Sequence, residues 1–388
     1  MPAPSSTRDL RLDFFRGVAL IFIFVDHIPE NILSYFTLQA VGFYDAAEVF
    51  IFISGFTAAL VYGQRLIAKG ALYATAQIWR RAWQLYVAHV FLFVIFIGEV
   101  SYTVMTFNNP MYNEEMRVAD FLVHPHLAVM QALLLEFQPT FLDILPLYIL
   151  MMLLFPAMLL GIRYRPFAVL GGSFLLYLAV QVFSLSVAAY PEGATWYFNP
   201  LAWQFLFVSG AVLGHMAMRG RTSPALTHAL IPLAIAILVF AVVVRLSWTI
   251  GGLWPAVPSL LLKELWPVNK TDLSPIRLIP FFATVVLVAA WVRPDERFMA
   301  SRAARPLVLA GRQSLEVFCL GIVLSALGHF ILAQYQHRLA MQVAVNAVGI
   351  GAMLLTAKML DWYKSMDRVP APRPAVAARP GRGDEAPL

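Results

Sequence analysis

Long apolar runs alternate along this chain with short polar stretches. A helix needs about 20 mostly apolar residues to cross the hydrocarbon layer of a bilayer, and about ten runs approach that length. The pattern predicts an all-α, polytopic transmembrane helical bundle of about ten spans. The runs cover residues 12–33, 44–64, 82–105, 141–161, 167–188, 199–218, 226–247, 276–292, 307–331 and 340–361.

Two segments depart from this pattern. The stretch 118–137 is less apolar and carries His124, His126 and Glu136. We expect it to form a helix that lies on or dips into the membrane, with an extra span as the alternative. Residues 363–388 are rich in Pro, Ala and Arg, a composition typical of disorder. We therefore expect one membrane domain over residues 1–362, followed by a disordered cytoplasmic tail.

The Lys and Arg residues orient the predicted helices, because positive residues stay in the cytoplasmic loops of membrane proteins. When the N-terminus is placed inside, every second loop carries the basic clusters and the loops between them carry mostly acids. Both termini are therefore expected in the cytoplasm. The net charge of +6 reflects this topology. No nucleic-acid partner is expected, because the basic residues do not form one stripe.

Composition excludes a soluble domain. Hydrophobic residues make up 60% of the 388 positions and charged residues 13%, and the mean hydropathy is +0.72, well outside the range of soluble chains. The single cysteine, Cys319, excludes a disulfide framework. The first run lacks a small-residue cleavage site, so we expect no cleavable signal peptide. No metal site is expected.

Ionisable side chains inside apolar runs usually have a function, because their burial in a bilayer is costly. Asp26 and His27 lie together near the far end of the first run. Helical spacing places His27 on the same face as Arg16, which has Asp13 one turn before it as a structural pair. Asp26 points about 100° away from His27 around the helix. We therefore expect another carboxylate, with Glu48 as the candidate, to orient the imidazole.

Further polar and aromatic residues gather at the two ends of the predicted helices. By default, tryptophans at the outer side form an interfacial belt, and basic residues at the inner side anchor the protein. An alternative is that one side binds a sugar and the other a phosphate. The outer candidates are Asp143, Asn199, Trp203, Gln204, Lys270 and Arg277, and the inner candidates are Arg16, Arg81, Arg312 and Ser314.

Several of these positions fall in short blocks that resemble the OpgC family, a branch of the integral-membrane acyltransferases. The resemblance implies O-succinylation of osmoregulated periplasmic glucans in the inner membrane of Gram-negative bacteria. It implies succinyl-CoA as co-substrate, with no tightly bound cofactor. His27 matches the catalytic first-helix histidine of the broader group. The blocks are residues 8–17, 26–29, 42–55, 145–148, 199–204 and 311–315.

The residue pattern suits such a reaction. We expect Arg16, Arg81 and Arg312, with Ser314, to bind the CoA phosphates at the inner face, because a guanidinium pairs well with phosphate. The distance from Arg16 to His27 is about 16 Å along a helix, which an extended pantetheine arm can cover. His27 would then act as the general base on a glucan hydroxyl. An acyl-histidine intermediate is the mechanistic alternative.

Other residues receive supporting roles in this hypothesis. Glu48, or Asp26 through a partner, would stabilise the imidazolium, and Asp143 is a further catalytic candidate. Asn199 or Gln204 would donate to the oxyanion, and Trp203 would stack on a sugar. A succinyl donor carries a second negative charge, for which Arg277, backed by Lys270, is the expected partner.

Two other classes of function compete with the enzyme. A proton-coupled or solute transporter of the inner membrane also places polar residues in helices, although the polar groups here gather at two mouths rather than at the midplane. A membrane scaffold leaves Asp26, His27, Glu48 and Asp143 without a role. Among acyltransferases, the acyl group, the acceptor carbohydrate and the oligomeric state stay open.

Overall fold

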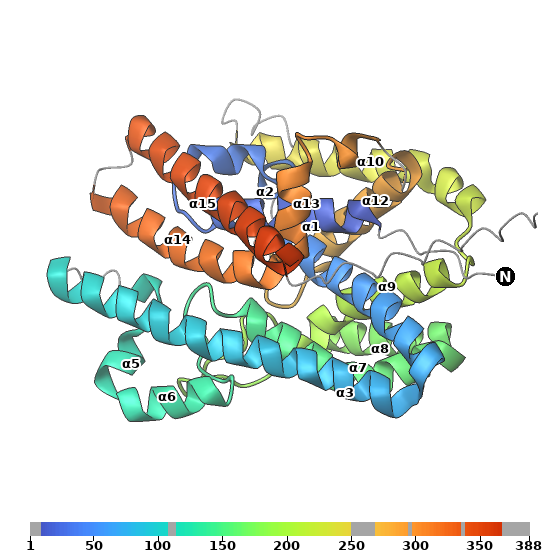
Figure 1. Ribbon diagram of the computed structural model, residues 1–388, viewed down its shortest axis with the longest axis horizontal. Helices are drawn as coiled ribbons and strands as arrows, with labels where there is room; N and C mark the ends of the chain where they lie inside the picture. The colour runs from blue at the N-terminus through green and yellow to red at the C-terminus, as the bar shows by residue number, and fades with distance from the viewer. Residues whose placement is uncertain (1–8, 108–113, 250–267, 294–296, 335–337, 367–388) are drawn as a thin grey trace, which may run out of the picture.

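The computed structural model describes residues 9–107, 114–249, 268–293, 297–334 and 338–366 (Figure 1). These residues are mostly helical, as the sequence predicted, with connecting loops and two isolated β-bridges between the helices. The helices are α1 (Leu10–Asp26), α2 (Leu38–Val41), α3 (Ala46–Phe107), α5 (Ala119–Val123), α6 (Pro125–Leu133), α7 (Ile144–Tyr164), α8 (Pro166–Phe183), α9 (Pro200–Met218), α10 (Pro224–Thr249), α12 (Pro275–Trp291), α13 (Arg305–Arg312), α14 (Ser314–Gln334) and α15 (Leu339–Met366), with 3₁₀ helices η1 (Ile32–Phe36) and η3 (Arg297–Ala300).

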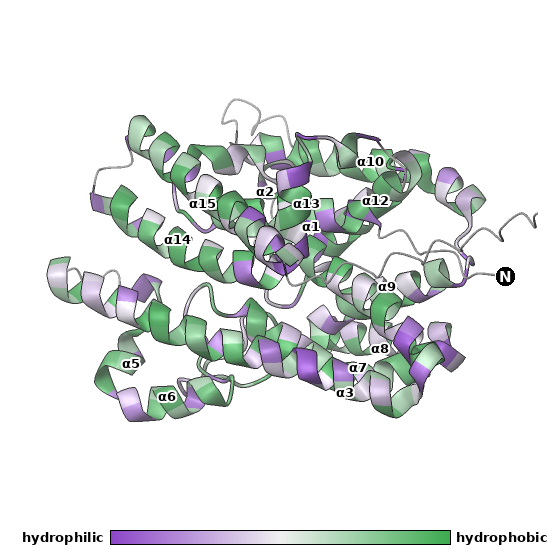
Figure 2. Cartoon of the chain, in the orientation of Figure 1, coloured by the Kyte–Doolittle hydropathy of each residue, from purple (hydrophilic) through white to green (hydrophobic). Residues whose placement is uncertain are grey.

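Seven described helices are long and apolar enough to cross a membrane, namely α3, α7, α8, α9, α10, α14 and α15. Most of each predicted run is helical, although the run 307–331 is divided between α13 and α14. Helices α10 and α14 are hydrophobic along most of their length (Figure 2). Large apolar side chains such as Phe91, Phe167 and Val243 lie exposed on the outside, which suits contact with lipid. The chain is therefore a membrane protein. The total of ten spans and the cytoplasmic termini stay predictions.

Helix α3 holds two of the predicted runs and bends between them. Gly70 interrupts its 62 residues with a φ of 84°, a left-handed conformation that glycine adopts without steric cost. Figure 1 shows the two halves of α3 meeting at a sharp bend and running in different directions. The predicted runs 44–64 and 82–105 therefore lie on either side of this bend.

Three expected boundaries differ in the structure. Helix α1 ends at Asp26, so the first run, 12–33, is helical only in its first part. The stretch 118–137 holds two short helices, α5 and α6, of 5 and 9 residues, and neither is long enough to span a bilayer. Helix α15 continues to Met366, beyond the expected start of the tail at residue 363. The rest of the predicted tail, 367–388, lies outside the described residues.

Close backbone contacts fix α1 at the centre of the bundle, where it packs on α3, α13 and α14. A Cβ atom on Gly17 would lie 1.9 Å from the carbonyl oxygen of Leu307, and one on Gly311 would lie 1.7 Å from that of Asp13. Only glycine fits at either position, as is common where membrane helices cross. The contact brings the first turn of α1 against the end of α13, so Asp13 and Arg312 meet.

Candidate active site

His27 caps the C-terminal end of α1 and is half-buried. Its Nδ1 atom donates a hydrogen bond to the carbonyl oxygen of Ile23, at 2.5 Å. Because a carbonyl oxygen only accepts, Nδ1 carries the hydrogen and Nε2 of the neutral ring carries a lone pair. The Phe141 ring packs edge-on against the imidazole, with 4.7 Å between centroids. The local helix end therefore holds His27 in the tautomer that a general base on Nε2 requires.

A cavity of about 580 Å³ surrounds this imidazole and is called here the histidine cavity. Its lining side chains come from helices α1, α2, α3, α7, α12 and α14 and from the segments before α3, α5, α7, α9 and α12. Five residues that the sequence proposed for the site line it together. Its acidic, basic and histidine lining residues are Asp26, His27, Asp45, Glu115, Arg117, Asp143, Lys270 and Arg277.

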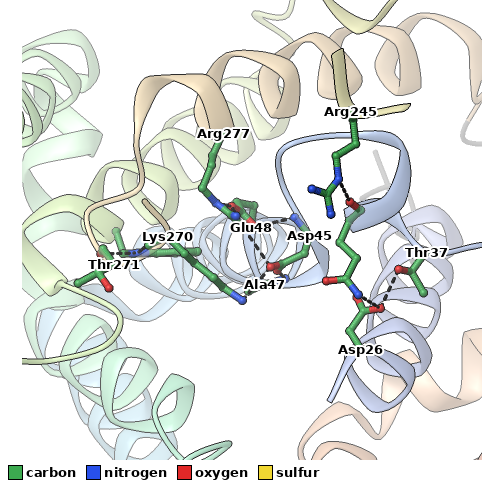
Figure 3. Close-up of polar contacts among 11 residues, drawn as sticks. Asp26, Thr37, Asp45, Ala47, Glu48, Arg245, Lys270, Thr271 and Arg277 are labelled. Atoms are coloured by element: carbon green, nitrogen blue, oxygen red, sulfur yellow. Dashed lines mark hydrogen bonds and ion pairs between the residues drawn. The ribbon is translucent and has the colours of Figure 1, made fainter. Parts of the chain in front are cut away.

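Four charged side chains form a compact network at one wall of this cavity (Figure 3). Asp45 lies 2.7 Å from the Nζ atom of Lys270 and 3.0 Å from Nη2 of Arg277. Glu48 is fully buried and lies 2.6 Å from the same Nη2 atom. Two acids and two bases meet here, so the network has a formal charge of zero.

The N-terminus of α3 explains why both acids lie in this network. Asp45 accepts a hydrogen bond from the Ala47 backbone N–H at 2.8 Å, and Glu48 accepts one from the Asp45 N–H at 3.0 Å. This reciprocal arrangement is a capping box with aspartate at the N-cap. The Asp-Ala-Ala-Glu spacing was the signal in the sequence that could have identified it.

Asp45 and Lys270 lie outside the helices, and each stabilises the charged form of the other. Burial alone would lower the pKa of the Lys270 ammonium, but the carboxylate of Asp45 outweighs it and holds that pKa above its usual range. Burial alone would raise the pKa of Asp45, yet the charges of Lys270 and Arg277 hold it well below its usual range. Both groups therefore stay ionised at neutral pH.

The expected partnership of Glu48 with His27 is wrong. Glu48 accepts its hydrogen bonds from Arg277 and from the Asp45 backbone, and the orienting group of the imidazole is the Ile23 carbonyl. A carboxylate near the end of a neighbouring helix was a reasonable candidate. However, Arg277 holds it on the side of α3 that faces α12.

Asp26 also lines the cavity without orienting His27. Its Oδ1 atom accepts hydrogen bonds from the Thr37 hydroxyl at 2.7 Å and the Gln39 amide at 2.9 Å. Arg245 in turn donates to the Gln39 carbonyl oxygen at 3.0 Å. Figure 3 shows this chain of contacts beside the charged network. Asp26 thus fixes the segment that follows α1, and a partner that would link it to the imidazole is not among its described contacts.

Arg277 and Lys270 were expected to receive a second carboxylate of the donor. Both side chains line the cavity, but each is already paired with Asp45 or Glu48. Their role in binding a second carboxylate of the donor stays a prediction. Asp143, the N-cap residue of α7, lines the same cavity, and its catalytic role stays a prediction.

Three expected acceptor-site residues prove to be internal supports. Asn199 is fully buried, caps α9 and donates to Leu185 and Asp272. Gln204 is also buried, and its amide bonds with Ser173 on α8. Trp203 is 0% exposed, which excludes it as a sugar platform. These predictions are wrong because a polar residue at a helix end can point into a cavity or into the protein interior, and the sequence does not show which.

Trp203 still bears on the site indirectly. Its Nε1 atom lies 3.1 Å from the carbonyl oxygens of both Lys270 and Thr271. The indole therefore fixes the backbone that presents the Lys270 ammonium to Asp45.

A second cavity, of about 140 Å³, is lined mainly by α3, with Arg16 of α1 at its wall, and is called here the arginine cavity. Arg16, Arg81 and Ser314 line it together, as the sequence proposed for a donor site. The Nη2 atom of Arg16 donates to the Thr57 hydroxyl at 3.1 Å. The fourth proposed residue, Arg312, is not among the described lining residues and lies 3.4 Å from Asp13. The proposed Asp13–Arg16 pair stays a prediction.

Sequence reasoning missed several residues of the site. Phe318 on α14 lines both cavities, and Phe141 packs on the imidazole. Glu115 and Arg117 reach the histidine cavity from the loop before α5, and Glu115 lies 2.8 Å from His329 on α14. Apolar rings and loop charges carry no periodic signal, so only the folded chain reveals them.

The family comparison agrees with this geometry. The sequence model of the family described as OpgC protein matches residues 8–365. The chain belongs to the OpgC protein family. No curated protein and no solved structure matches it significantly. The match spans both cavities and supports a membrane acyltransferase that modifies a glucan.

Proposed function

We propose that this OpgC family member is a transmembrane O-acyltransferase of a bacterial inner membrane. It moves a succinyl or another short acyl group from cytoplasmic acyl-CoA to a hydroxyl of a periplasmic glucan. The observation that carries the proposal is the placement of two cavities along one helix. Arg16 lies in the arginine cavity and His27 in the histidine cavity, about 16 Å apart at 1.5 Å per helical residue.

The arginine cavity suits the donor. Arg16 and Arg81 supply two guanidinium groups, and Ser314 and Thr57 add hydroxyls. Guanidinium groups bind phosphate through paired hydrogen bonds. In this proposal the CoA phosphates bind at this end of α1 and the pantetheine arm extends along the helix. The thioester then lies in the histidine cavity, where a carbohydrate hydroxyl meets it.

The tautomer of His27 suits general-base catalysis. Nε2 takes the proton of the attacking hydroxyl as its oxygen bonds to the thioester carbonyl carbon. The tetrahedral intermediate then expels the CoA thiolate, which recovers the proton from the imidazolium. The Ile23 carbonyl accepts from Nδ1 throughout and stabilises the positive ring. An acyl-histidine intermediate stays the alternative, because Nε2 is equally placed to attack the thioester itself.

A direct test uses purified protein in detergent with succinyl-CoA and a periplasmic glucan. We expect a succinyl mass increment on the glucan, detected by mass spectrometry, without any sealed membrane. Activity that appears only in sealed vesicles under an ion gradient would instead favour a transporter. Mass spectra of periplasmic glucans from cells with and without the protein would show which acyl group is transferred.

A further inference from the structure

Phe318 lies at the boundary between the two cavities. Its ring, 3% exposed on α14, lines both the arginine and the histidine cavity. It stacks on Phe50 of α3, with 6.1 Å between centroids and 28° between the planes. Phe50 in turn meets Tyr148 of α7 edge-on at 6.3 Å, and both of these rings line the arginine cavity. Three helices thus contribute one aromatic partition.

The position of this partition matters for any group that moves between the cavities. Arg16 lies on one side and His27 on the other, and both belong to α1. Phe318 is the lining residue that the two cavities share. Because protein interiors are close-packed, a chain that passes between the cavities at this shared wall must displace the Phe318 ring. A thin arm of methylene and amide groups can pass if Phe318 only changes its side-chain rotamer. A bulky acyl group requires more space than that change provides.

We propose that the Phe318 ring separates the arginine cavity from the histidine cavity and selects, by its size, the acyl groups that reach His27. This inference rests on the proposed acyl-CoA function. Phe318 then contacts the travelling acyl group and determines donor specificity, while His27 performs the chemistry. The competing interpretation is that Phe318 only fills the core, as most buried phenylalanines do.

The test compares a smaller and a larger side chain at this position across three donors: acetyl-CoA, succinyl-CoA and benzoyl-CoA. We expect Phe318→Ala to raise kcat/KM for benzoyl-CoA relative to succinyl-CoA by about tenfold or more, in line with the effect of added space in a pocket. We expect Phe318→Trp to lower kcat for succinyl-CoA by a similar factor, about tenfold.

Phe52→Ala is the matched control. Phe52 is a buried phenylalanine of α3 whose ring packs edge-on against Phe281 at 5.4 Å, and it lines a separate apolar cavity. This variant loses a comparable ring, so its melting temperature should fall as in Phe318→Ala. Its donor preference should nevertheless stay that of the wild type.

The outcomes distinguish a failure of the role of Phe318 from a failure of the proposed acyl-CoA function. An unchanged donor preference in Phe318→Ala overturns the role of Phe318, and so does an equal change in Phe52→Ala. Should Phe318→Trp fail to fold, Phe318→Ala and its control still decide. A wild-type protein that transfers no acyl group from any of the three donors overturns the proposed function itself.

Discussion

At the scale of single residues, His27 owes its chemical character to the end of α1. The helix stops at Asp26, and the Ile23 carbonyl one turn earlier accepts the Nδ1 hydrogen. The polar residues of the first run predict a functional histidine, and the structure places His27 at the wall of a cavity. They did not reveal what orients it, because a backbone carbonyl that accepts from a side chain leaves no mark in the sequence.

His27→Ala should reduce acyl transfer by about 10²- to 10⁴-fold, the usual contribution of a general base. Folding should persist, because the ring is half-buried and its one described hydrogen bond is local. Transfer rates and melting temperatures of the purified variants test this. A variant that transfers at the wild-type rate would show that another group takes the proton.

The charged network gives a second prediction at this scale. Arg277→Gln leaves Glu48, which is fully buried, beside Asp45 with no guanidinium between them. Removing one partner of a buried pair costs about 3–5 kcal/mol. Glu48→Gln should cost less, because Asp45 still neutralises Arg277. The double variant should be more stable than Arg277→Gln alone, as measured by unfolding in detergent.

The exposed pair Lys364–Glu316 supplies the control for this cycle, with side chains that are 48% and 44% exposed. Lys364→Gln should change stability by less than about 1 kcal/mol. If Arg277→Gln is equally mild, the network does not hold α12 against α3.

At the scale of helices, the glycines of α1 and α13 determine how closely these two helices pack. The hydropathy pattern predicted the helices, because lipid imposes helical backbone on any apolar segment that crosses it. It could not predict which helices touch. That information resides in the close approach of Gly17 to Leu307 and of Gly311 to Asp13. The same limit explains why Asn199, Trp203 and Gln204 were assigned to the wrong face.

Gly311→Ala should destabilise the protein and weaken transfer together. The added methyl group would meet the Asp13 backbone, which cannot retreat without moving α1 and its arginine. Gly351→Ala in α15 is the control, since its Cβ would meet nothing within 4 Å, and it should be neutral or stabilising by up to about 1 kcal/mol. Equal melting temperatures for the two variants would contradict the close packing of α1.

At the scale of the whole molecule, the proposal requires the two cavities to face opposite compartments. Cysteine labelling can test this orientation. The single native cysteine, Cys319, is partly buried, so a cysteine introduced at an exposed position should be the main site of labelling. We expect an impermeant maleimide to label Glu30→Cys from the periplasmic side of intact spheroplasts, and Arg302→Cys only after the membrane is opened. The reverse pattern would invert the topology that the basic loops predict.

The central claim is that the acyl group crosses from one face of the protein to the other. Its most direct test is a proteoliposome with isotopically labelled succinyl-CoA on one side of the bilayer and a glucan on the other. The account predicts labelled glucan in the compartment that holds no CoA, and none with His27→Ala. Labelling that occurs only when donor and acceptor share one compartment would contradict it.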